Sequence, residues 1–144
     1  MAKILGNDYR LFVESPTPGT YNQIGGQGDL SVDRKAGSID ISDKNSAPYG
    51  LVAAGNFAVE ISLDGIPDLP DANGLARVDT QFKARTATKF QIRNGALGTG
   101  ADVKFEASCN ILDLSINLGK DSGGSYSIRL GLAASPATDT LFVP

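Results

Sequence analysis

The sequence predicts a mainly β protein, a β-sandwich or partly closed barrel with one packed α-helix, and three observations lead to this class. Glycine supplies 17 of 144 residues, about 12% against a usual level of roughly 7%, and glycine suits turns because it enters positive φ without steric cost. Several short stretches alternate apolar and polar residues, as strands with one buried face do. One stretch alone has helical spacing, so an all-helical fold is excluded.

The first half of the chain contains the clearest strand patterns. Residues 9–14 alternate, and residues 21–24 and 30–33 suggest a hairpin around a turn at 25–28 that has three glycines in four residues. Residues 38–42 and 57–63 also alternate. Between the last two strands, residues 43–55 show no periodicity of either kind, so we expect a long inter-strand loop of the sort that is often functional or mobile.

The stretch 71–85 predicts the helix. Leu75, Val78 and Phe82 fall on one stripe, and Asp71 or Asn73 can serve as the N-cap. We expect this stripe to lie on the sheet, with the basic and amide side chains of the helix facing water.

The second half predicts further strands at 89–93, 103–109, 111–118 and 126–132. A turn at Asn94-Gly95 opens a glycine-rich loop that ends at Gly100, and the phase changes near Leu112-Asp113, which predicts a bulge or break. The apolar tail 141–143 could dock on its own domain or on a neighbour. No repeat or linker is evident, so we expect a single domain over 1–144.

The composition argues against an enzyme. The chain has no histidine, which removes the common catalytic triads and most zinc sites. Its single cysteine, Cys109, is in phase with apolar strand residues and is expected in the core. Possible acid pairs lie on turns or solvent faces: Asp40 with Asp43, Asp68 with Asp71, and Asp102 with Glu106. We therefore expect no catalytic residue, cofactor or metal.

Charge and hydropathy argue against two kinds of partner, nucleic acid and membrane. A formal charge of −3 with scattered basic residues does not suit a surface that holds nucleic acid. The start of the sequence lacks the apolar core of a secretory signal, and no run is long enough to cross a membrane. We expect synthesis in the cytosol and no membrane binding by the subunit.

The layout resembles that of the major tail tube proteins of long-tailed, siphovirus-like bacteriophages and related phage-like particles. The resemblance spans nearly the whole chain: an early strand at 9–13, the segment 38–46 before a glycine-bearing loop, the strand 57–65, one helix and a closing set of strands. Residues 39–46 are similar to the family's Val/Ile-Asp-Thr/Ser-Ser-Lys-Asp/Asn-Ser pattern. Asp43 stands where the family more often has Ser or Thr, and the loop lacks the tryptophan of some members.

The resemblance implies a structural virion protein that forms hexameric rings, in which subunit sheets join into one continuous inner β-barrel. The rings would stack into a tail tube, the conduit for DNA ejection into the host, with transient and non-specific passage of DNA. It also implies assembly in the host cytoplasm, localisation in the virion tail, and contacts with the tape measure, tail terminator and baseplate or distal tail proteins. Closing a sheet removes its exposed edges, which is physically consistent with such a ring.

Two groups of residues follow as candidate sites. The loop 43–55 is the expected ring-to-ring contact, with Tyr49 as an aromatic anchor and Lys44 as a charge partner; its candidate residues are Asp43, Lys44, Ser46, Pro48 and Tyr49. Acids on the solvent phase of strands could face the lumen, where they would repel phosphate; the alternative is that they coat the outer surface. These acids are Glu60, Asp102 and Glu106.

Other classes remain as alternatives. The main one is a β-sandwich binding or decoration module of a virion or appendage, although sugar sites favour exposed aromatics and this chain has no Trp and four Tyr. A two-carboxylate glycosidase is weaker, because no acid pair stands out. A closer alternative is the tube of a contractile tail or secretion system, which the sequence alone hardly distinguishes from the tube of a long, non-contractile tail.

Overall fold

The computed structural model describes residues 8–45, 48–94, 102–120 and 123–141. The elements in chain order are β1 (Tyr9–Glu14), β2 (Tyr21–Gln23), β3 (Gln27–Asp40), β4 (Val52–Gly65), α1 (Leu75–Ala84), β5 (Thr88–Asn94), β6 (Asp102–Asn117), β7 (Ser125–Leu132) and β8 (Thr138–Asp139).

All strands belong to one 8-stranded antiparallel sheet with the order β2-β1-β5-β6-β7-β4-β3, and β8 pairs with β6. The prediction of a mainly β fold with one packed helix is confirmed for the described residues. The sheet is not closed into a barrel, because β2 and β3 stand at its two ends. It nevertheless curls: the Gln27 amide, at the start of β3, donates to the Leu11 carbonyl of β1 at 2.7 Å and accepts from the Leu11 N–H at 2.9 Å.

The core lies on one face of this curled sheet. Its fully buried side chains come from five strands, from Ile24 after β2 and from α1, and each large apolar one contributes roughly 1.5–3 kcal/mol relative to exposure. The largest are Leu11, Ile61, Leu63, Phe90, Ile92, Phe105, Ile128 and Leu130. Cys109 is a free thiol within the same cluster, as predicted.

Helix α1 packs against the sheet as expected, but it begins later than residue 71. Leu75 and Val78 are buried, whereas Phe82 is 40% exposed. Gly74 is the N-cap residue and has no side chain to offer. Asp71 takes over this role, because its carboxylate accepts from the N–H groups of Gly74 and Leu75, both at 3.1 Å.

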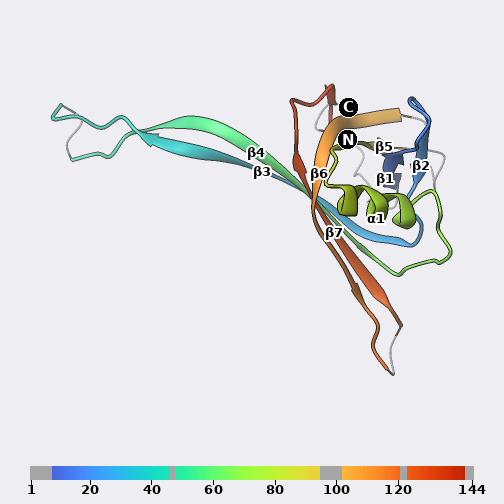
Figure 1. Cartoon of the computed structure of the whole chain (residues 1–144). Coiled ribbons are helices and arrows are strands. Elements are labelled where there is room, and N and C mark those ends of the chain that lie inside the picture. The colour runs from blue at the N-terminus through green and yellow to red at the C-terminus, as the bar shows by residue number, and fades with distance from the viewer. Residues whose placement is uncertain (1–7, 46–47, 95–101, 121–122, 142–144) are drawn as a thin grey trace.

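Strands β3 and β4 form a long two-stranded arm that leaves the body of the molecule (Figure 1). The predicted strand at 30–33 and residues 38–40 of the one predicted at 38–42 are parts of the single strand β3, which ends at Asp40. The loop expected at 43–55 is wrong at its end, because residues 52–55 belong to β4, and residues 52–54 of these pair with the end of β3. The connecting segment is 41–51, and a bulge interrupts the ladder between Ala36 and Ser38.

The hairpin predicted from 21–24 and 30–33 is wrong. β2 pairs with β1, and β3 pairs with β4. The glycine-rich turn has Gly26 at a φ of 69°, but the strands on either side of it pair with different partners and run in the same sense within the antiparallel sheet.

Strands β6 and β7 form a second hairpin that also projects from the body (Figure 1). The predicted irregularity near Leu112 is confirmed, since the register shifts between Ile111 and Asp113. Leu112 is the extra residue and is 50% exposed.

The C-terminal segment returns along β6. Leu141 packs against the core cluster, which favours docking on the same chain, and residues 142–143 lie outside the described part. Asp139 of β8 forms an ion pair with Arg34 of β3, so the root of the arm is tied to the end of the chain. The predicted loop at 95–100 also falls outside the described residues.

Candidate assembly surfaces

The end of the arm is closed by its own hydrogen bonds. The Ser42 hydroxyl accepts from the Leu51 N–H at 2.6 Å, and the Ile41 N–H donates to the Leu51 carbonyl at 3.0 Å. The Asp40 carboxylate accepts from the Ser42 N–H at 2.9 Å, and this bond is the main reason that the pKa of Asp40 lies below its usual value. The arm therefore ends in a defined turn that carries a carboxylate at neutral pH.

The predicted ring-contact residues lie at this tip. Asp43, Lys44, Pro48 and Tyr49 are all exposed, and Tyr49 is 76% exposed. The Asp43 carboxylate accepts from the Asn45 N–H at 2.9 Å. Ser46 lies outside the described residues.

The sequence patterns missed the apolar surface of the arm. Exposed side chains of this kind lie on both of its strands and at the two ends of the connecting segment: Ile39, Ile41, Leu51, Val52 and Phe57. Apolar side chains gathered on one projecting element mark a protein-contact surface. Alternation places Phe57 in phase with buried Val59, and only the structure shows that this position has left the body.

Several strand edges are unpaired among the described residues, and β3 and β6 each provide one, as does β2 at the opposite end of the sheet. β3 pairs with β4 alone. On β6, pairing with β5 stops at Cys109, so residues 110–117 have β7 on one side and no described strand on the other. Unpaired edges offer backbone N–H and C=O groups to another chain.

Two of the three predicted lumen acids lie on the face of the sheet opposite the core. Glu60 alternates with buried Val59 and Ile61, and its carboxylate lies 3.4 Å from the Arg129 guanidinium on β7. Glu106 alternates with buried Phe105 and Ala107. Asp102 is exposed at the start of β6. The structure does not gather the three acids into one cluster.

Glu106 takes part in a hydrogen-bonded network that links β2, β5 and β6. Its carboxylate accepts from the Gln91 amide at 3.0 Å and from the Tyr21 hydroxyl at 2.9 Å. These two bonds, the Gln91 bond first, hold the pKa of Glu106 below its usual value. Burial, reinforced by Glu106, raises the pKa of Tyr21, so the phenol stays protonated and donates. Arg93 lies 4.5 Å from the centre of the Phe12 ring and 5.6 Å from that of Tyr21.

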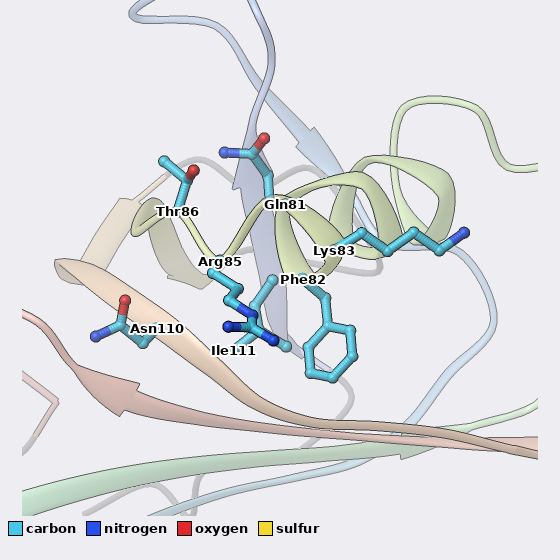
Figure 2. A pocket seen from close by; sticks show the side chains of 7 residues that line it. All are labelled: Gln81, Phe82, Lys83, Arg85, Thr86, Asn110 and Ile111. Atoms are coloured by element: carbon cyan, nitrogen blue, oxygen red, sulfur yellow. The ribbon is translucent and has the colours of Figure 1, made fainter.

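An open groove of about 570 Å³ lies between the end of α1 and β6. In Figure 2, Phe82 and Arg85 point from the helix end toward β6, whereas Lys83 points away along the helix. Ile111 and Asn110 line the side formed by β6. Lys83 is engaged with Asp79 at 2.9 Å, which leaves Arg85 as the cation of this groove.

Histidine is absent from the sequence, and among the described residues no three or more Cys, Asp or Glu side chains gather to hold a metal ion. Burial raises the pKa of the Cys109 thiol to about 12, which keeps it protonated. No helix in the described part is long and apolar enough to cross a membrane.

An open antiparallel sheet with unpaired edges and an exposed apolar arm defines a β protein with surfaces suited to contact with other chains. Residues 3–137 match the family model described as phage tail tube protein, and the chain belongs to that family. It is a structural protein of the virion tail. No curated protein matches significantly.

Solved structures with the same fold come from assembled tails. The tail of an empty gene transfer agent particle, refined with C6 symmetry, has a TM-score of 0.80 at 16% identity, covering 94% of this chain and 98% of that one. The virion of a native gene transfer agent has a TM-score of 0.76 at 14% identity, covering 93% of this chain and 97% of that one. The SPP1 tail tube has a TM-score of 0.73 at 15% identity, covering 96% of this chain and 83% of that one.

Proposed function

We propose that copies of this chain join through their sheet edges into hexameric rings, that the rings stack into a tube, and that DNA passes through this tube during ejection. The free edges of β3 and β6 together with the arm carry this proposal. We treat residues 1–144 as one tail-tube domain without catalytic activity.

Strand direction supports the joint between copies. β3 runs antiparallel to β4, β4 to β7 and β7 to β6, so β3 and β6 run in opposite directions. Pairing β3 of one copy with residues 110–117 of the next continues the antiparallel order. Six such joints would give one continuous inner barrel, and sixfold symmetry matches the C6 tail with which this chain shares its fold.

The polar face of the β6-β7-β4-β3 ribbon is the proposed lumen wall. It carries Ser62 and Glu60 on β4, Arg129 on β7 and Asp113 on β6, in alternation with the core residues. Acids on this wall repel phosphate, and serines offer no charge to which it could bind. Glu60 fits this role with its charge moderated by Arg129, whereas Glu106 is held by Tyr21 and Gln91 and acts as a structural group.

The arm is the proposed contact between stacked rings, with Asp43, Lys44, Ser46, Pro48 and Tyr49 at its tip. Its exposed apolar side chains need a partner outside the subunit. By its family, the finished tube would meet a tape measure protein in its lumen and a terminator and baseplate at its ends, after assembly in the host cytoplasm.

The test replaces residues 41–51 by Asn-Gly, which joins the last paired residues, Asp40 and Val52, through a two-residue turn. We expect a folded subunit by circular dichroism that forms rings but no long tubes in negative-stain microscopy. Tubes of normal length would overturn the role of the arm. An unsubstituted protein that stays monomeric at high concentration would overturn the tube itself and favour a binding module.

A further inference from the structure

The groove between α1 and β6 has the chemistry of a receptor for a short acidic and apolar strand end. Phe82 and Ile111 provide apolar surface, and Arg85 provides the cation. Arg85 is exposed, has a left-handed φ of 55° just after the helix, and points toward β6 (Figure 2). The Lys83 ammonium is already occupied by Asp79.

The arm end has the complementary chemistry on one of its two faces. Asp40 and Val52 form the last pair of the β3–β4 ladder, and directly paired residues project from the same face. Val52 is 68% exposed, and Asp40 is kept ionised by the Ser42 N–H. The opposite face carries Ile39, which is apolar without a charge beside it.

The arm cannot fill the groove of its own chain. Its end projects away from the body that holds α1 (Figure 1). The arm end must therefore come from a second copy, and the proposed stacking of rings already brings the arm of one copy against another copy.

We propose that the groove formed by Phe82, Arg85 and Ile111 receives the arm end of a second copy, with Val52 on the apolar surface and Asp40 against Arg85. This proposal rests on the proposed function and identifies the receiving site for the arm. Close charge pairs at protein interfaces fix register as well as adding affinity, so the pairing gives the stack a preferred angle.

A charge exchange tests the polar half of the proposal. Arg85→Asp and Asp40→Arg are each expected to raise the protein concentration needed for tube growth about tenfold, the effect of losing one such pair. The double variant restores growth to within about threefold of the unsubstituted protein. Lys89→Asp, at an exposed cation on β5, is the matched control and should not rescue Asp40→Arg. Failure of the double variant to recover overturns the pairing.

Cross-linking tests the apolar half without relying on growth rates. Val52→Cys with Phe82→Cys should form disulfide-linked oligomers in assembled tubes and none in dilute subunits. Ile39→Cys with Phe82→Cys, on the other face of the arm, should not link. Buried Cys109 stays outside this reaction. Tubes without the Val52–Phe82 link overturn the groove as the receiving site and leave the tube intact, whereas no tubes at all from the unsubstituted protein overturns the proposed function.

Discussion

Glu106 shows how one surface acid becomes a structural group. Its two neutral donors, the Gln91 amide and the Tyr21 hydroxyl, favour the ionised carboxylate and lower its pKa in the folded state. Because the folded pKa lies below the unfolded one, the stabilisation is fully present above the unfolded pKa of about 4.3. It is lost as pH falls through the folded value.

We therefore expect Glu106→Gln to destabilise the subunit at pH 6 and to differ little from the unsubstituted protein near pH 3. Urea unfolding followed by circular dichroism at a series of pH values measures this difference. Tyr21→Phe removes one of the two donors and should reproduce part of the pH dependence. A difference between Glu106→Gln and the parent that is the same at every pH would contradict this role.

Asp71 is a second residue that holds distant parts together. Its carboxylate accepts from Gly25 at 3.0 Å as well as from Gly74 and Leu75 at the start of α1. Asp71→Ala leaves these three N–H groups without their acceptor, and we expect a loss of about 2 kcal/mol in the free energy of unfolding.

Asp68→Ala is the matched control for Asp71→Ala. Asp68 is exposed three residues upstream, so its removal should change stability by less than about 0.5 kcal/mol. Equal effects of the two substitutions in chemical denaturation would exclude the capping role of Asp71.

At the scale of elements, the turn into the arm depends on one glycine. Gly26 has a φ of 69°, and a Cβ added there would lie 1.8 Å from the Ile66 carbonyl oxygen. We expect Gly26→Ala to cost about 3 kcal/mol because it combines strain with a backbone clash.

Gly19 separates these two effects. Its φ is 84°, but an added Cβ would meet nothing within 4 Å, so Gly19→Ala should cost only about 1 kcal/mol. Thermal unfolding of the two variants measures the difference, and a Gly26→Ala protein as stable as Gly19→Ala would show that the turn can move aside.

The elements that sequence predicted best are those with one buried face. Strand β7 and the bulge near Leu112 follow from alternation, because burial of every second residue creates the pattern. Near the tip of the arm this alternation of burial is absent, because both faces of the arm are exposed there. That is why β3 looked like two strands and why residues 52–55 looked like loop.

The sequence also did not predict which strands pair with each other. A glycine-rich turn predicts a reversal, but β2 and β3 separate because each is paired elsewhere. The candidate tip residues follow from their place in a long unpatterned segment. The groove does not, because Phe82 and Ile111 lie far apart in sequence and meet only through the packing of α1 on β6. The Tyr21–Glu106 bond, across 85 positions, is equally hidden.

At the scale of the whole molecule, the free edge of β6 predicts a separable effect on assembly. Ile116 is 53% exposed and lines a groove of about 380 Å³ beside this edge, together with Leu69 and Ala76. We expect Ile116→Glu to lower stability by less than about 1 kcal/mol, but to abolish rings because it places a charge where the next copy must pack.

Sedimentation velocity across a concentration series measures the change in oligomeric state. Thr80→Glu is the control, since Thr80 is an exposed residue on α1 and does not line that groove. Hexamers from Ile116→Glu at the same concentrations as from the control would mean that residues 110–117 are not the joint.

The two edges that join in the proposed ring differ from each other, since one belongs to β3 and the other to β6. A row of copies joined in this way always keeps one edge of each kind, however many copies it holds, until its ends meet. When the row closes into a ring, its last β3 edge pairs with its last β6 edge. No free edge then remains for sideways growth, so any further copy can add only above or below the ring. In the proposed assembly, the open sheet of the single subunit would thus make the width self-limiting while the length stays free.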